Sequence, residues 1–489
     1  MTVSKHIDKA RIRALTIRKF CPTIIVVCLI LSAWPLSVRA EDQPFQTGLS
    51  PGGVGGEQIM EIDRQFLLEL IRLGRFNILF FEEANYHQKW RSWAYPLGRE
   101  AGTAASFANS LVDIDQRGSH LHDPSQINRG AQRKGLASAV VGNAVSGSSS
   151  GLELMQNLWV MNRARKEGLS PRDSLDFVKG ALKRTDNLLA ERELIVAAIP
   201  IAGRRRIRES EGVLLQRLRD QLVFEFRRWS VHSRERAWRE NTFFAIDALQ
   251  NYVNMGSSII SLQSFRYPLR SGAAAITSLT STSAATLNPI VRTLVGVCMR
   301  KYQRHKLARE LPIKRPTMPQ GLSLQEVKEL QDESSEKDAK RLEEVAFLSE
   351  NSEKLDTTID REAHSIERFR QVAQQQTISG PIIGLTAVAR SILSTIAFYD
   401  YRENKIVANK LSFGGRISQA TGQAYALFDT PYTYVKGVIR KRRSERSGQS
   451  LTQILERRKH WLDRLESQLI SASPQPQAAP PQAVAPAKN

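Results

Sequence analysis

The sequence predicts an all-α protein: a bundle of long helices with a coiled-coil element, helical hairpins rich in small residues, and a disordered C-terminal tail. Apolar residues recur at spacings of three and four along most of the chain, which is the period of a helix. Helix-start signals precede two of these stretches, at Ser170-Pro171 and at Ser323–Glu326. No alternation of strand and helix patterns is recognisable, and the 489 residues suffice for two or three domains.

Residues 1–40 have the pattern of a signal peptide. A basic segment leads into the apolar core Ile24–Leu31, and Val38-Arg39-Ala40 resembles a cleavage site. The alternative is an uncleaved signal anchor, which the short core disfavours because a spanning helix needs ~20 apolar residues. We therefore expect an exported protein that is periplasmic, secreted or peripherally associated with a membrane. A flexible entry loop rich in Pro and Gly is expected at residues 41–56.

The regular apolar spacing continues through a first helical region, residues 57–311. Ile59–Leu73 has an amphipathic pattern, and Ser170 is suited to cap a helix from Pro171 to about Ala198. A long pattern from Ile207 to about Met255 carries an apolar stripe, with arginine and glutamate interleaved on its other faces. We expect these three segments to be the long helices of the region.

Four stretches interrupt this regularity and carry weaker helical signals. Residues 117–134 are polar and rich in turn formers, so they predict a loop. Residues 135–151 are dominated by Gly, Ala, Ser and Val, which allow close helix contacts but form helices weakly. Residues 256–299 predict two or three short helices with tight turns, and residues 411–422 predict a turn.

A Pro-rich linker, residues 312–322, is expected to precede a second helical region, residues 323–470. This region has the sharpest periodicity of the chain and predicts a coiled coil at about residues 341–376. The alternative is a solvated single helix, which is disfavoured because isolated helices need tertiary support. A last helix is expected at residues 451–470, before a disordered Pro/Ala-rich tail at residues 471–489. The predicted seam consists of Val345, Leu348, Leu355, Ile359, Ile366 and Phe369.

Residues 378–398 form the most apolar part of the chain after the leader. Their nine Ile, Leu, Val and Phe residues contribute about −3 to −5 kcal/mol to insertion at the centre of a bilayer. Arg390, near the middle, opposes insertion by about 2.5–3.5 kcal/mol. A lone spanning helix is therefore marginal, and burial within a bundle is the favoured interpretation. Insertion of this segment at a membrane surface is the alternative.

The chain carries a formal charge of +21 and two dense basic runs. Such a balance indicates an acidic partner. For an exported protein, anionic lipid headgroups or envelope polymers are expected before nucleic acid. The alternative is a solvated basic surface without a dedicated partner. The runs comprise Arg204, Arg205, Arg206 and Arg208, and then Arg440, Lys441, Arg442, Arg443 and Arg446.

No catalytic, cofactor-binding or metal site is predicted. Gly147–Gly151 matches G-x-S-x-G, but the nucleophile elbow of that pattern requires a preceding strand, so a small-residue turn is the favoured interpretation. The segment His120–Asp123, with His87 as a further ligand, is a weak candidate metal site because it lies in a polar loop. Cys298 follows an apolar segment and is expected to be a small buried side chain.

Two functional hypotheses follow from these observations. The first is an extracytoplasmic structural or interaction protein that self-associates through the coiled coil and contacts anionic envelope surfaces. The second is a helical membrane-inserting or pore-forming protein that uses residues 378–398. An enzyme is the least supported class, because no catalytic constellation is recognisable and no cofactor or small-molecule substrate is inferred.

Overall fold

The computed structural model describes residues 55–83, 94–313, 379–446 and 451–471. It divides the chain into two units, Met1–Gly53 and Val54–Asn489, and every described residue belongs to the second. The predicted signal peptide and coiled-coil seam lie outside the described residues. So do nearly all of the predicted entry loop, Pro-rich linker and C-terminal tail.

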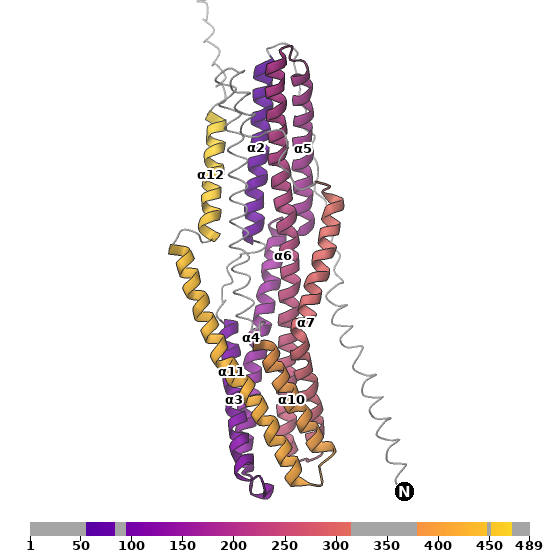
Figure 1. Ribbon diagram of the computed structural model, residues 1–489, viewed down its shortest axis with the longest axis vertical. Helices are drawn as coiled ribbons and strands as arrows, with labels where there is room; N and C mark the ends of the chain where they lie inside the picture. Colours follow the sequence, from indigo (N-terminus) through magenta and orange to yellow (C-terminus); the bar gives the residue numbers. More distant parts are fainter. Residues whose placement is uncertain (1–54, 84–93, 314–378, 447–450, 472–489) are drawn as a thin grey trace, which may run out of the picture. The chain divides into compact units, whose positions relative to one another are not determined.

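Long helices account for almost all of the described residues, which confirms the all-α prediction (Figure 1). The predicted helices near residues 59–73, 171–198, 207–255 and 451–470 are all present. In chain order the elements are α2 (Gly55–Phe81), α3 (Ala94–Ser119), the 3₁₀ helix η2 (Pro124–Gln126), α4 (Arg129–Lys166), α5 (Pro171–Ala197), α6 (Ala202–Ser264), α7 (Arg270–Glu310), α10 (Ser379–Tyr399), α11 (Lys405–Arg446) and α12 (Leu451–Ser471).

Two side-chain caps explain where helices begin. Ser170 caps α5 as predicted, because its hydroxyl oxygen accepts the Asp173 N–H at 3.2 Å. Asn128 caps α4, and its side-chain oxygen accepts the Gly130 N–H at 2.9 Å. The loop predicted at residues 117–134 is therefore only partly present, since α3 continues to Ser119 and α4 already begins at Arg129.

The weak helix signals of the small-residue stretches were misleading, because these stretches lie almost entirely inside long helices. Residues 135–151 belong to α4 and residues 411–422 belong to α11. Of residues 256–299, the first nine end α6, a single turn follows at 265–269, and the remainder is the one helix α7 in place of several short helices. Pro289 lies inside α7 without ending it. Tertiary contacts override the low intrinsic propensity here, since small side chains let neighbouring helices approach closely.

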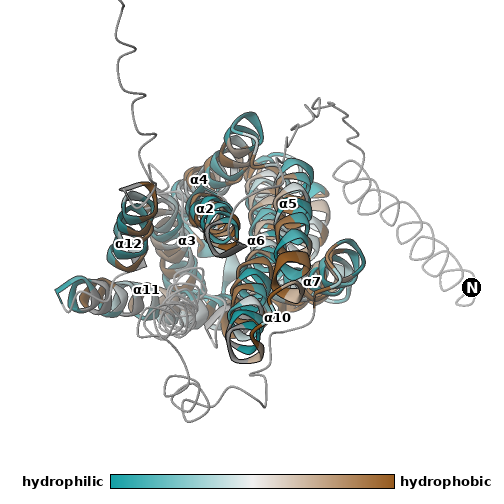
Figure 2. Cartoon of the chain, turned by 90° about the horizontal axis from the view of Figure 1, so that it is seen from above, coloured by the Kyte–Doolittle hydropathy of each residue, from teal (hydrophilic) through white to brown (hydrophobic). Residues whose placement is uncertain are grey.

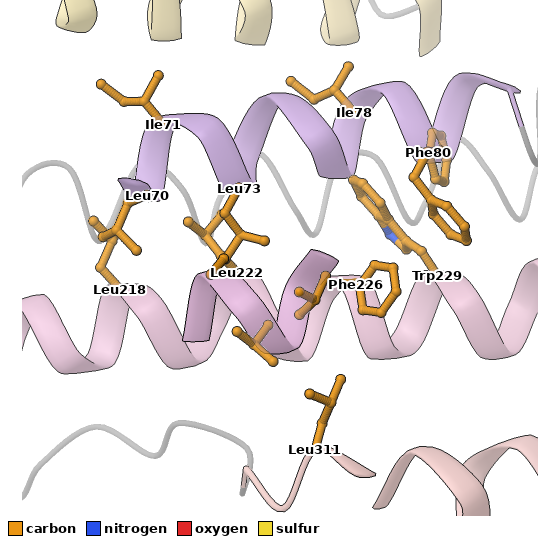
Figure 3. Close-up of a cluster of buried hydrophobic side chains, with 14 of the residues drawn as sticks. Leu70, Ile71, Leu73, Ile78, Phe80, Leu218, Leu222, Phe226, Trp229 and Leu311 are labelled. Carbon is orange, nitrogen blue, oxygen red and sulfur yellow. The ribbon is translucent and has the colours of Figure 1, made fainter. Parts of the chain in front are cut away.

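One group of helices, the body, packs around an ordinary apolar core. The body comprises α2, α5, the first half of α6, the end of α7, and α12. Leu70 and Leu73 of α2 point toward Leu218 and Leu222 of α6, and Phe226 and Trp229 continue this row along α6 (Figure 3). The large side chains of this core are fully buried, as expected for a water-soluble helical bundle.

Buried ion pairs tie the helices of the body together. Arg458 of α12 forms a bidentate pair with Glu225 of α6, in which its Nη2 lies 2.8 Å from Oε2, and both side chains are buried. Arg192 of α5 bridges two carboxylates, with Nε 2.7 Å from Asp63 Oδ1 of α2 and Nη2 3.1 Å from Glu211 Oε2 of α6. These pairs fix the register of the body helices, because an unpaired charge there would be costly.

The remaining helices form a second group, which we call the ring. It consists of three hairpins: α3 with α4, the second half of α6 with α7, and α10 with α11 (Figure 1). The main packing partners close a circuit, because α3 packs on α4, α4 on α6, α6 on α7, α7 on α10, α10 on α11, and α11 on α3. Viewed along the long axis, hydrophobic and hydrophilic residues occupy different sides of individual helices (Figure 2).

Small residues hold the first hairpin of the ring together. A Cβ atom added at Gly142 of α4 would lie 2.8 Å from Ala105 Cβ and 2.9 Å from the carbonyl oxygen of Gly102. We expect Gly142→Leu to lower the free energy of unfolding by at least about 1–3 kcal/mol, because α3 and α4 must move apart. Ala137→Leu, on the exposed side of α4, is the matched control and should leave thermal unfolding unchanged. Equal effects of the two substitutions would contradict this packing.

Candidate functional site: a polar cavity inside the helix ring

The ring encloses a cavity of about 190 Å³, large enough for several water molecules. All six ring helices contribute to its wall. Along α6 the lining runs from Phe243 to Ser261, a length of about 27 Å at ~1.5 Å per residue. The cavity is therefore a narrow column along the axis of the ring. Its wall is mainly polar, with Asn109 on α3, Asn143 on α4, Asn251 and Ser257 on α6, Thr282 and Asn288 on α7, Arg390 on α10, and Gln419 and Gln423 on α11.

The polarity of the ring is the reverse of that of the body. In the described residues of the ring (94–162, 245–300 and 379–446), no Leu, Ile, Val or Met side chain is buried. The buried positions are occupied instead by Gly, Ala, Ser, Thr, Asn, Gln423, Tyr95 and a few charged side chains. Many large aliphatic side chains are exposed, and only Leu136 and Ile383 among the described ones line the cavity. In a water-soluble bundle the opposite distribution is expected.

An ionic network closes the end of the cavity nearest the body. Arg99 Nη1 of α3 donates to Asp247 Oδ1 of α6 at 2.7 Å and to the Tyr95 hydroxyl at 2.7 Å. Ser150 of α4 donates to the other oxygen of Asp247 at 2.5 Å. Arg99 and Asp247 thus form an ion pair in the wall at this end of the cavity.

A second network lies near the other end and is not neutral. Asp113 of α3 contacts two arginines, with its Oδ2 2.5 Å from Arg416 Nε of α11 and its Oδ1 3.0 Å from Arg117 Nε. These neighbours keep the carboxylate ionised. Arg390 of α10 is close enough to interact electrostatically with this group, but it forms no ion pair or hydrogen bond with any other described residue. Three guanidinium groups therefore accompany one carboxylate.

Other polar groups of the wall are also left unpaired. Asn288 is buried, and its side-chain nitrogen donates to the Phe243 carbonyl oxygen at 3.3 Å. Its side-chain oxygen accepts no hydrogen bond within the described part of the chain. Buried polar atoms without a partner are rare in proteins, and they commonly bind water or a ligand. The wall therefore offers both a cation, Arg390, and a hydrogen-bond acceptor, the Asn288 side-chain oxygen, to a molecule in the cavity.

The outer surface of the ring is apolar and continuous over several helices. On α4 the exposed side chains follow helical spacing, at Val141, Val145, Leu152, Met155 and Trp159. On other helices of the ring the exposed apolar set includes Leu249 and Ile259 on α6, Leu287, Ile290, Leu294 and Val297 on α7, Leu385 and Ile392 on α10, and Tyr425, Phe428, Tyr432 and Val435 on α11. Contiguous surfaces of this kind mark contact with lipid or with another protein.

Charged residues are scarce in this apolar zone. Residues 135–152 of α4, 248–265 of α6 and 271–291 of α7 contain none, and residues 379–399 of α10 and 411–428 of α11 contain one arginine each. Those arginines, Arg390 and Arg416, face the cavity and Asp113 respectively. The uncharged part of α3, residues 101–112, is shorter. The charges that flank it point inward, to the Arg99 and Asp113 networks described above.

Contacts at both ends show that these segments lie side by side at one level. At the end near the body, Arg99 contacts Asp247, and Glu100 of α3 hydrogen-bonds Thr430 of α11. At the hairpin end, Gln132 of α4 donates to Asp113 at 2.9 Å, and Arg133 lies 5.2 Å from the centre of the Phe265 ring. We call this zone the uncharged belt. By length and apolar composition, one helix in it could cross a membrane alone, at Ile382–Tyr399.

The structure tests several residues that the sequence singled out. In the first basic run Arg205 and Arg206 are exposed, and Arg208 instead pairs with Glu211 at 2.9 Å. In the second run Arg442, Arg443 and Arg446 are exposed. The side chains of Arg204, Arg440 and Lys441, and the whole predicted seam, lie outside the described residues.

The structure also shows where the G-x-S-x-G segment, the candidate metal site and Cys298 lie. Gly147–Gly151 is continuous helix in α4, where Ser149 donates to the Val145 carbonyl oxygen at 2.8 Å, so the segment has no elbow geometry. Among the described residues, no group of His, Cys, Asp and Glu side chains gathers to hold a metal ion. Asp123 caps η2 instead, and His87 is not described. The predicted burial of Cys298 is wrong, because it is exposed on α7.

The cavity itself was not predicted from the sequence. Its residues come from six helices, and their inward positions emerge only once the ring is closed. One usable signal was present in the chain, namely repeated uncharged stretches of similar length. Comparisons of the chain with known protein families, with curated proteins and with solved structures find no match.

Proposed function

We propose that the protein is a membrane protein whose ring crosses a lipid bilayer and encloses a polar passage. The observation that carries this proposal is the reversed polarity of the ring, with polar side chains inside and aliphatic side chains outside. This distribution is favourable in a lipid bilayer, because apolar side chains on the outside of the ring then contact hydrocarbon and not water. This develops the membrane-inserting hypothesis, with six helices in place of one apolar segment.

The dimensions of the uncharged belt fit a bilayer. Its longer segments have 18 to 21 residues, which is about 27–32 Å of helix at ~1.5 Å per residue. The hydrocarbon core of a typical bilayer is about 30 Å thick. These segments lie almost entirely within continuous helices, which hydrogen-bond most of their own backbone polar groups, as a lipid environment requires.

The hairpin ends carry the residues expected at a membrane surface. Tyr267, between α6 and α7, and Tyr399, at the end of α10, are both about half exposed. Arg270 lies 4.7 Å from the centre of the Tyr267 ring, and Arg266 lies 5.6 Å from it. Tyrosine and basic side chains are favoured where hydrocarbon meets headgroups.

The ring also explains how Arg390 can lie within a membrane segment without contacting lipid. If α10 crossed the membrane as a lone helix, the Arg390 side chain would face lipid, and this would make insertion less favourable by about 2.5–3.5 kcal/mol. In the ring its side chain lines the cavity. Ionisable residues within membrane segments characteristically face such interior spaces.

The basic runs support a complementary part of the proposal. Arg205 and Arg206 are exposed on the body, and Arg442, Arg443 and Arg446 are exposed near the end of α11. The signal-peptide pattern of residues 1–40 supports a location of the body outside the cytoplasm. There these arginines would contact anionic lipid headgroups or envelope polymers, each worth ~1 kcal/mol near an anionic surface. Self-association through the predicted seam remains part of this proposal.

Fractionation of the native host tests the proposal, with a tag placed after Asn489. We expect the protein to remain with the membrane after washes with salt and with alkaline carbonate, and to be released by detergent. Release by salt alone would favour a peripheral protein bound through its basic runs. A freely soluble protein whose outer apolar faces are covered by further copies would contradict the proposal, and its mass in solution would reveal this.

A further inference from the structure

We infer that the cavity of the ring is a binding site for small anions and that Arg390 is the residue that binds them. This inference deepens and rests on the proposed function, because it names the class of solute that the polar passage accepts. It is carried by Arg390, a cation that has no ion-pair or hydrogen-bond partner among the described residues and lines a polar column.

The charge balance around Arg390 is the first argument. The Asp113 carboxylate is already engaged by Arg416 at 2.5 Å and by Arg117 at 3.0 Å. Asp247, which lines the cavity, is engaged by Arg99 at 2.7 Å. No described carboxylate lies within ion-pair distance of Arg390. A partly buried cation without an ion-pair partner is costly, so an anion from solution would be attracted to it.

The position of the guanidinium group is the second argument. Close packing holds the backbone at this level, since a Cβ added at Gly415 of α11 would lie 3.2 Å from both the Cα and the carbonyl oxygen of Arg390. The side chain extends from this fixed backbone to the cavity. A guanidinium group offers several N–H donors in one plane, which suits chloride, carboxylate and phosphate oxygens alike.

The neighbouring wall supplies neutral donors that can complete the coordination of an anion. Ser278 and Thr282 of α7 line the cavity and reach Ser391, the residue after Arg390, with oxygen–oxygen distances of 3.2 Å. Gln419 and Gln423 of α11 line the opposite part of the wall. The Ser110 hydroxyl oxygen lies 3.2 Å from the Gln419 side-chain oxygen and 2.9 Å from the Gln423 side-chain oxygen, and it can donate to one of them at a time. With their oxygens facing Ser110, both glutamines keep their amide nitrogens as donors. Hydroxyl and amide donors beside one cation form an anion site without excess charge.

The binding test uses the purified full chain, in detergent or buffer as fractionation dictates, titrated calorimetrically with sodium phosphate and separately with sodium chloride. Wild-type protein should bind at least one of these anions. Arg390→Gln should weaken the Kd about tenfold or more, since a hydrogen bond to a charged group is lost. Arg72→Gln is the matched control, because Arg72 is exposed on α2 and far from the ring. Absence of binding by wild type, or equal binding by Arg390→Gln, would overturn the inference.

A stability measurement distinguishes an Arg390 that binds anions from an Arg390 that only stabilises the fold. In anion-poor buffer, Arg390→Gln should melt at a higher temperature than wild type, because it removes a partly buried cation that has no ion-pair partner among the described residues. Added phosphate or chloride should raise the melting temperature of wild type and of Arg390→Lys, but not that of Arg390→Gln. A lower melting temperature of Arg390→Gln under all conditions would assign Arg390 to the structure alone. Anion binding by a protein absent from membranes would overturn the proposed function and leave this inference standing.

Discussion

Replacing Val141 by arginine should remove the protein from the membrane fraction. Val141 is exposed on the outer face of α4, near the middle of the uncharged belt. A basic side chain on a lipid-facing position at the bilayer midplane costs about 2–4 kcal/mol. In water the same substitution at an exposed site changes stability by about 0.5 kcal/mol or less. The size of the effect therefore reports which solvent surrounds the ring.

The matched control for this substitution is Leu194→Arg. Leu194 is even more exposed, but it lies on α5 in the body, where the surroundings are aqueous in our account. We expect Leu194→Arg to fractionate like wild type and Val141→Arg to be lost from the membrane, by degradation or by release. Leu385→Arg, on the outer face of α10, should behave like Val141→Arg. If all three variants match wild type, the outer face of the ring does not contact lipid.

Replacing Glu225 by alanine should lower the free energy of unfolding of the body by about 3–5 kcal/mol. The substitution leaves Arg458 of α12 buried without its carboxylate partner, and such uncompensated charges are among the most destabilising defects known. Thermal or denaturant unfolding followed by circular dichroism measures the loss. α12 is expected to detach first, because this pair joins it to α6.

Two variants give this prediction its controls. Glu82→Ala breaks the partly exposed pair of Glu82 with Lys459, 2.7 Å apart, which also joins α12 to the body. Its effect should not exceed about 1 kcal/mol. The double substitution Glu225→Leu with Arg458→Met removes both buried charges and should recover most of the lost stability. A Glu225→Ala effect as small as that of Glu82→Ala would show that Arg458 finds water or another partner.

The helices of the body were predictable from the sequence for a physical reason. Their apolar side chains face one shared core, so that residues such as Leu214, Leu218 and Leu222 produce the period that identifies a helix. The cap at Ser170 is equally local, since its partner Asp173 is three residues away. Features that arise within a few turns of one helix can be recognised in the sequence of that helix.

The ring resisted the same approach because its helices have polar residues on their buried side. Ser146 and Gly142 of α4 face other helices, while Val141 and Val145 face outward, so the usual interpretation of apolar residues as core fails. Small residues form helices weakly on their own, whereas close contacts between helices stabilise them here. Polar lining residues also lower the mean hydropathy of each helix, and among the described helices only α10 is long and apolar enough to cross a membrane alone.

The candidate site depended on distant residues and was not predictable in detail. Arg390 was evaluated as a penalty on a lone helix, because nothing in residues 378–398 indicates which side of α10 is enclosed. Its surroundings are set by Asp113 on α3 and by Arg416 on α11. The misplacement of Cys298 has a similar cause. Its apolar neighbours suggested a core position, but on α7 such residues form the outer surface.

The most direct test of the central claim is to measure the solvent at each face of the ring by spin-label accessibility in proteoliposomes. Labels would be attached to single cysteines in place of Val141 and Leu385 on the outer face, Asn143 in the cavity and Leu194 on the body, with the native cysteines replaced by serine. We predict that the outer labels collide with oxygen and are shielded from a water-soluble nickel complex. The labels at positions 143 and 194 should be reached by the nickel complex. Outer labels as open to nickel as the label on the body would contradict a ring that crosses the bilayer.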